Sequence, residues 1–273
     1  MQIVFNVLIL SVTELVYLLG ILIGVGILLG WIKSVSDDWA YKALGKPGIL
    51  LTACIGTPIH ELGHAVMCLI FGHKINAIKF FIFNPRSSTL GYVNHSYNKH
   101  NLYQVIGNFF ISLGPIFSGT AAILFSMYML EPDIFHALQS YVITAPIEYN
   151  VNHFVEWSVN SIIIVYSGIF VNGNLESMHF WLFLFLTTCI SSHIALSRED
   201  IKGAISGLCV TLFIFVICNM ILSLWAIGTL NYVLFVAKYN IYLLSVLSVS
   251  VAFSLITAFV MGLLCGIRSL ISK

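Results

Sequence analysis

The sequence predicts an all-α polytopic membrane protein with about six transmembrane helices and a small β-hairpin at the inner membrane face. Apolar residues make up 59% of its 273 residues and charged residues only 8%, whereas an ordinary soluble domain has roughly 25% charged residues. Six apolar runs are long enough to cross a bilayer, which takes roughly 20 residues of helix. A segment between the second and third runs has the composition of a β-hairpin.

This composition excludes a soluble enzyme, a disordered chain and a nucleic-acid-binding protein, because so few charges cannot cover the surface of a globule. Lys and Arg number 12 and Asp and Glu number 11, so the net charge of +1 gives no bulk attraction for an acidic partner. We therefore expect the lipid bilayer to surround a single integral membrane domain, residues 1–273. Nothing in the sequence specifies an oligomeric state.

The predicted spans are residues 5–32, 48–72, 105–130, 178–196, 203–228 and 241–267. The first run has no basic segment before it and is too long for a signal-peptide core, so we expect a retained helix. Glu14 lies near one end of this run, and we expect its carboxylate to reach the membrane interface. Residues 154–172 are also apolar, but Glu156 and Asn160 favour an interfacial or re-entrant helix there.

The distribution of Lys and Arg predicts the orientation, since cytoplasmic loops are enriched in these residues. With six spans and a cytoplasmic N-terminus, the inner segments contain eight Lys and Arg residues and the outer loops contain four. Loop 131–177 contains no Lys or Arg, which is typical of an outer segment. The sequence therefore predicts a multi-pass protein with its N- and C-termini in the cytoplasm.

Residues 73–101 differ from the apolar runs around them. Two short stretches rich in β-branched and aromatic residues, 74–83 and 89–97, flank the polar residues 84–88. This pattern is typical of a hairpin. We expect a small sheet at the inner membrane face, with an edge strand that an extended peptide can pair with.

The second apolar run contains the motif His60-Glu61-Leu62-Gly63-His64. On a helix, His60 and His64 lie one turn apart on the same face, so both imidazoles can bind one metal ion. Zinc in such a site lowers the pKa of a bound water to about 7. Glu61 lies beside the pair and is expected to act as general base without binding the metal.

The position of this motif inside an apolar run makes a chance match improbable. A charged group at mid-membrane costs roughly 2.5–3.5 kcal/mol on insertion scales, and a bound metal offsets that cost. The alternative is a purely structural role, in which the two histidines form hydrogen bonds between helices. Thr57-Pro58 precedes the motif, either as the N-cap and first residue of a helix or as a kink within one.

A catalytic zinc site usually has three protein ligands, so a third ligand is expected from another span. Both His193 and Asp200 are candidates, and with Ser197 they follow the i, i+4, i+7 spacing of one helix face. His193 is the closer match in depth. The alternative reading of this segment is a helix start at which Ser197 is the N-cap. The remaining histidines, including His73 and His95, are expected to be solvated or at the membrane interface and to form no second cluster.

These motifs resemble the site-2 protease family of intramembrane zinc metalloproteases, of which the chain looks like a divergent, minimal member. The resemblance rests on HELGH at 60–64, the hairpin-like segment 73–97, and Gly107-Asn108 and Gly114-Pro115 in the next span. It implies a protease core at about residues 48–210, with extra helices at 1–47 and 211–273.

In that family an Asp at the start of a later helix completes the zinc site. The resemblance therefore implies that Asp200 is the third ligand, and His193, the closer match in depth, stays as the alternative. Gly203 corresponds to the small residue that follows the Asp, although the family's Asp-Gly step is here Asp200-Ile-Lys-Gly203.

The implied function is an intramembrane zinc metalloendopeptidase that hydrolyses membrane-embedded or membrane-associated peptides through a zinc-bound water. A helical substrate must unwind before this attack, because its peptide groups are engaged in intrahelical hydrogen bonds. The hairpin would then hold the unwound segment as an added strand, and Asn108 would steady that strand or the oxyanion. Zn²⁺ is the expected cofactor.

Two other readings remain open. In the CAAX-type proteases, which also contain HELGH, a downstream Glu is the third ligand, and Glu148 or Glu156 would have to take that role. The chain could instead be a non-catalytic membrane protein, such as a peptide transport accessory, a receptor or an immunity factor, that retains a metal site. The presence of Glu61 favours an enzyme, because a purely structural site needs no base.

Overall fold

The computed structural model describes residues 2–83, 89–144, 151–171, 174–225 and 227–271. Helices dominate these ranges, and a single two-stranded sheet is found among them, as the predicted all-α class with a small hairpin requires. The elements are α1 (Gln2–Leu44), α2 (Lys46–Ile70), β1 (Lys74–Lys79), β2 (Tyr92–Ser96), α3 (Leu102–Leu130), α4 (Pro132–Thr144), α5 (Val151–Ile169), a 3-10 turn (Asn174–Glu176), α6 (Met178–Ser191), α7 (Arg198–Leu224), α8 (Leu230–Ala237) and α9 (Asn240–Ile271).

Five helices in the described ranges are long and apolar enough to cross a membrane, namely α1, α2, α3, α7 and α9. The predicted span 178–196 is shorter than expected, because α6 has only 14 residues. Its C-cap is Ser192, after which the chain turns. The chain is thus a membrane protein with five candidate spans, and the predicted sixth is not among them.

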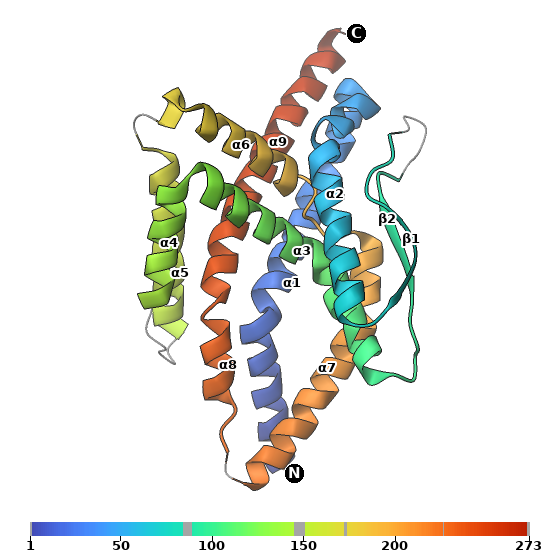
Figure 1. The fold of residues 1–273 in the computed structure, drawn as a ribbon, viewed down its shortest axis with the longest axis vertical. Helices are drawn as coiled ribbons and strands as arrows, with labels where there is room; N and C mark the ends of the chain where they lie inside the picture. Colours follow the sequence, from blue (N-terminus) through green and yellow to red (C-terminus); the bar gives the residue numbers. More distant parts are fainter. Residues whose placement is uncertain (1, 84–88, 145–150, 172–173, 226, 272–273) are drawn as a thin grey trace.

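The helices pack in two groups on either side of a central pair (Figure 1). The central pair is α1 and α9, which run side by side along the long axis. On one side α2 packs against α3, α3 packs against α7, and the hairpin lies along the outer side of α2. On the other side α4 and α5 pack together, and both contact α9. The predicted extra helices α1 and α9 therefore form the centre of the molecule.

The two ends of the chain lie at opposite ends of the long axis (Figure 1). Five spans would separate the termini in this way, whereas the predicted six would return both to the cytoplasm. The first helix also continues unbroken to Leu44, beyond the predicted limit of residue 32.

Glu14 is buried in the interior, with only 1% of its surface exposed. Asn219 Nδ2 of α7 donates to its Oε2 at 2.6 Å, and Thr229 Oγ1 lies 2.5 Å from its Oε1. The expectation that this carboxylate reaches the interface is therefore wrong. Hydrogen bonds from other segments replace water, as a buried polar group requires.

The short segment between α6 and α7 is held firmly by apolar packing. Ile194, Ala195 and Leu196 are 2%, 2% and 8% exposed, and they belong to one core cluster with residues of α1, α3 and α9. Full burial of an Ile or Leu side chain stabilises the fold by roughly 1.5–3 kcal/mol. The start of α7, two residues after Leu196, is thereby held in place.

The hairpin has the antiparallel pairing that the sequence predicts. Lys74 pairs with Ser96, and Lys79 pairs with Tyr92, with an irregularity between Ile75 and Ala77. The predicted turn, residues 84–88, lies outside the described residues. Both strands contact α2, so the hairpin lies beside the helix that contains the HELGH motif.

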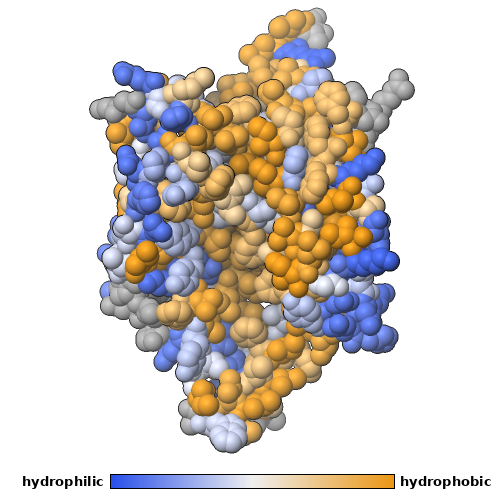
Figure 2. Space-filling view, in the orientation of Figure 1, coloured by the Kyte–Doolittle hydropathy of each residue, from blue (hydrophilic) through white to orange (hydrophobic). Residues whose placement is uncertain are grey.

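Apolar side chains cover most of the middle of the face shown in Figure 2, while hydrophilic residues gather towards the hairpin and towards α4 and α5. Large apolar side chains remain exposed on the candidate spans, for example Leu69 of α2 at 70% and Phe125 of α3 at 65%. An exposed apolar surface of this extent is typical of contact with lipid.

Candidate metal centre

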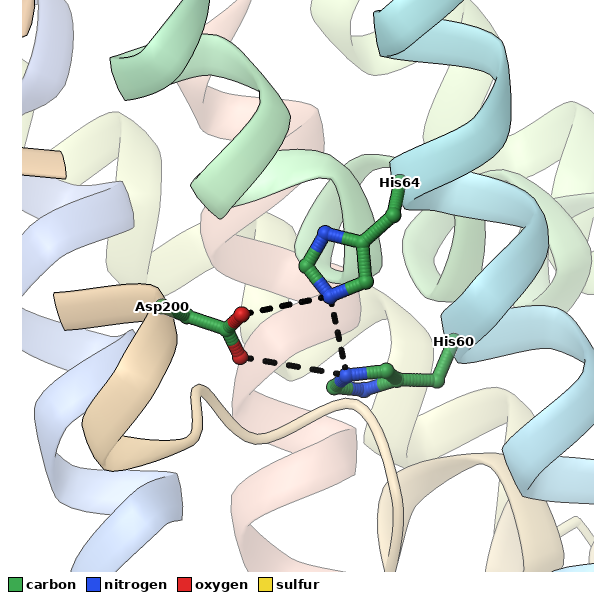
Figure 3. A group of neighbouring side chains, drawn as sticks. All are labelled: His60, His64 and Asp200. Carbon is green, nitrogen blue, oxygen red and sulfur yellow. Dashed lines mark hydrogen bonds and ion pairs between the residues drawn. The ribbon is translucent and has the colours of Figure 1, made fainter. Parts of the chain in front are cut away.

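The site forms where α2 meets the start of α7. α2 is one unbroken helix from Lys46 to Ile70 with Pro58 inside it, so Thr57 does not start a helix. His60 and His64 lie one turn apart on α2, and both rings point toward Asp200 at the start of α7 (Figure 3). One possible ligand atom from each of the three residues can be chosen so that all lie within 4.8 Å of one another.

The Nδ1 nitrogen of each histidine ring forms a hydrogen bond with a backbone carbonyl. His60 Nδ1 lies 2.8 Å from the carbonyl oxygen of His193, and His64 Nδ1 lies 2.7 Å from that of Ile111. A carbonyl oxygen only accepts, so each Nδ1 must donate. In a neutral ring, Nε2 then has a free lone pair, which is the usual arrangement of metal-binding histidines.

These lone pairs converge with a carboxylate on one point. The two Nε2 atoms are 3.2 Å apart, and His64 Nε2 is 3.3 Å from Asp200 Oδ1. His60 Nε2 is 3.9 Å from Asp200 Oδ2. Ligand atoms about 2.0–2.1 Å from a tetrahedral zinc are about 3.3 Å apart, so two of these three separations match such a site. Without a cation, two lone pairs and a carboxylate would face one another unfavourably.

Asp200 fits both of the interpretations that the sequence leaves open, a helix cap and a candidate metal ligand. Ser197 Oγ accepts from Asp200 N–H at 3.1 Å, and Ser197 N–H donates to Asp200 Oδ2 at 2.7 Å. This reciprocal pair is a capping box that starts α7. The bond to Oδ2 orients the carboxylate and leaves Oδ1 directed toward His64. The N-cap reading and the ligand reading are therefore compatible.

His193, the other candidate ligand, has its ring engaged elsewhere. Its Nε2 lies 3.0 Å from Thr52 Oγ1, and its Nδ1 lies 3.4 Å from Lys33 Nζ. The ring is only 4% exposed and is not part of the convergent group. His193 contributes to the site through its backbone carbonyl, which orients His60.

The His193→Ala variant is therefore expected to retain about one zinc per chain, because the carbonyl that binds His60 stays in place. Metal analysis of the purified protein after zinc loading and desalting checks this expectation. Loss of the metal from a variant that still elutes as folded protein would show that the ring of His193 is the third ligand.

Two glycines of α2 allow neighbouring segments to approach the histidines closely. A Cβ at Gly63 would overlap the carbonyl group of Gly114 on α3, and one at Gly56 would lie 2.7 Å from His193 Cβ. The close approach at Gly63 brings α3 within reach of His64, and that at Gly56 brings the α6–α7 segment within reach of His60. Each glycine thus permits a contact that orients one histidine.

We expect Gly63→Ala to lower the thermal midpoint in detergent and to weaken zinc binding by about 10–100-fold, because α3 and its Ile111 carbonyl must move away. Competition with a fluorescent chelator measures the zinc affinity. The matched control is Gly24→Ala on α1, where an added Cβ meets nothing within 4 Å. Equal behaviour of the two variants would contradict this account of Gly63.

A cavity of about 940 Å³ opens beside the three residues. Glu61, 7% exposed, and Asn108, also 7% exposed, both line it. Lys33 and Asp37 of α1 line it too, joined by an ion pair of 2.9 Å. The predicted general base and the predicted substrate contact therefore lie on the same cavity as the candidate metal ligands, with room for water and a peptide segment.

No family model, curated protein or solved structure matches the chain. The site must therefore be judged by its own geometry. That geometry brings together His60, His64 and Asp200 from two helices and places Glu61 on the cavity they share. Of the alternative ligands, Glu148 lies outside the described residues and Glu156 lies on α5, apart from this group.

Sequence reasoning missed two features of the site. Lys33 and Asp37 fall between the predicted spans 5–32 and 48–72, but they lie on α1 and line the cavity. His73 and His95, expected to be solvated, form a hydrogen-bonded pair with their Nδ1 atoms 3.0 Å apart. The hairpin pattern contained a signal for this pair, because antiparallel pairing brings residues 73–75 opposite residues 95–97.

Proposed function

We propose that the chain is an intramembrane zinc metalloendopeptidase that hydrolyses membrane-embedded or membrane-associated peptides. The observation that supports this most strongly is the convergence of two imidazole Nε2 atoms and the Asp200 carboxylate, with both Nδ1 atoms bonded to backbone carbonyls. The two histidines and Asp200 would hold the ion. When bound, zinc supplies Lewis acidity and lowers the pKa of a coordinated water to about 7.

Glu61 is the residue proposed to move the proton. It follows His60 directly on α2, so its side chain points to one side of the metal ligands, and it lines the cavity. In the proposed reaction its carboxylate takes a proton from the attacking water and gives it to the leaving amine. Asn108 Nδ2 lies 3.5 Å from Ser206 Oγ. In the proposed reaction, this amide turns toward the carbonyl oxygen under attack.

The segment that enters β2 supports an extended binding mode for the substrate. A Cβ at Gly91 would lie 2.9 Å from Glu61 Cγ, so the chain passes directly beside the general base. In the described sheet β2 pairs with β1 along one edge only. A peptide that added to the free edge would have its backbone held extended, the conformation in which its amide bonds are accessible.

The test is hydrolysis of a pool of synthetic 20-residue apolar peptides by zinc-loaded protein in detergent, with products detected by mass spectrometry. The proposal predicts internal cleavage that requires zinc and is restored when zinc is added to the chelated protein. A zinc-loaded protein that leaves every peptide intact, or cleavage that persists after removal of the metal, would refute it.

A further inference from the structure

His73 and His95 form a second histidine pair beside the candidate metal centre. His73 lies three residues after the end of α2 and is 4% exposed, while His95 lies on β2 and is half-buried. The ring of His73 stacks on that of Tyr97, with centroids 5.0 Å apart and planes 16° apart. His95 and Tyr97 alternate with outward residues along this stretch, and both line the cavity that contains Glu61.

The hydrogen bonds of the pair determine its tautomers. His73 Nε2 lies 2.7 Å from the carbonyl oxygen of Gln104, so it must donate. In the neutral ring, His73 Nδ1 is then an acceptor. The Nδ1 of His95, 3.0 Å away, must therefore donate to it. This leaves a lone pair on His95 Nε2, on the opposite edge of a ring that lines the cavity.

Two further observations concern the state and the position of His95. Burial, together with the neighbouring imidazoles of His73 and His64, lowers the pKa of His95. His95 also lines the same cavity as the three candidate metal ligands. With only two imidazoles, bonded to each other through their Nδ1 atoms, the pair is not itself a metal site.

We propose that His95 is a substrate-binding residue whose Nε2 accepts a hydrogen bond from an N–H group of the peptide in the cavity. His73 is a positioning residue that holds the ring of His95 in the required tautomer. The inference rests on the proposed function for the class of ligand, a peptide. An extended peptide presents backbone N–H groups to its sides, and a fixed acceptor selects the register in which one of them meets Nε2.

Two substitutions of His95 test the roles of its two ring nitrogens separately. The amide of Asn lies near the position of Nδ1, and the amide of Gln reaches the position of Nε2. We expect His95→Asn to bind peptide about tenfold more weakly and His95→Gln to stay within about threefold, as loss of one hydrogen bond implies. Binding is measured as retention of the apolar peptide pool on zinc-loaded Glu61→Gln protein, which is expected not to cleave it. Equal binding by the two variants would overturn the proposal.

The tautomer is tested separately by ¹⁵N NMR of histidine-labelled protein in detergent. His95 is expected to be protonated at Nδ1 in the native chain, and to become a mixture of tautomers in His73→Gln. The amide of Gln can still donate to the carbonyl oxygen of Gln104, but the substitution removes the Nδ1 atom that accepts from His95 Nδ1. A native His95 protonated at Nε2 would also overturn the proposal.

The outcomes distinguish this proposal from the proposed function. If the native protein cleaves the pool and both His95 variants bind alike, the peptidase stands and the role of His95 fails. If the native protein cleaves nothing but His95→Asn still binds more weakly than His95→Gln, the role of His95 stands and the peptidase fails. If the native protein cleaves nothing and no peptide is retained, both proposals fail.

Discussion

The Glu61→Gln variant is expected to lose at least 100-fold in the rate of peptide cleavage while it keeps its zinc and its thermal midpoint. General base catalysis contributes roughly 10²–10⁴-fold, and an amide of the same shape cannot take up the proton. The three candidate ligands are unchanged, so the metal stays bound. Cleavage rate and zinc content are measured on the same preparation.

The matched control is Glu156→Gln on α5, which makes the same chemical change away from the cavity. It should cleave at the native rate. If Glu61→Gln cleaved as fast as this control, Glu61 would not be the base. If it also lost its zinc, Glu61 would be a ligand, and the geometry that excludes it from the convergent group would be contradicted.

The Asp200→Asn variant is expected to bind zinc at least roughly 100-fold more weakly and to lose cleavage in parallel. Even residues that only orient a ligand change metal affinity about 10–100-fold, and a carboxylate that touches the ion contributes more. An Asn at this position keeps an oxygen that can accept from Ser197 N–H. The start of α7 should therefore survive the substitution, and affinity is read by chelator competition.

Because Asp200 also belongs to the capping box, its two roles need separate controls. Ser197→Ala removes the hydroxyl that caps Asp200 N–H and should cost about 0.5–2 kcal/mol of stability with zinc retained. Glu199→Gln changes the neighbouring carboxylate and should leave zinc affinity unchanged. Equal zinc loss in Ser197→Ala and Asp200→Asn would mean that the cap, rather than a carboxylate ligand, determines metal binding.

The sequence predicted the features that depend on local pattern. The HELGH motif lies on a helix as expected, because an i, i+4 pair in an apolar run has few other placements. The hairpin was also predicted, since its composition differs sharply from that of the spans around it. The positions of Ser197 and Asp200 also indicated both a helix cap and a candidate metal ligand.

Features that depend on tertiary packing were harder to predict. The carbonyls of His193 and Ile111 that orient the histidines have no side-chain signature. The burial of Glu14 depends on Asn219, more than 200 residues away in the chain. The length of the predicted span 178–196 was overestimated, because apolar composition alone does not show where α6 ends. Residues 192–196 turn and pack in the interior instead of continuing the helix.

The most direct test of the central claim is X-ray absorption spectroscopy of the purified, zinc-loaded protein, since it reports the ligands of the metal themselves. The account predicts one zinc per chain with two imidazole nitrogens at about 2.0–2.1 Å and the remaining ligands oxygen. Zinc with fewer than two imidazoles, or with sulfur at about 2.3 Å, would contradict the assignment of His60, His64 and Asp200.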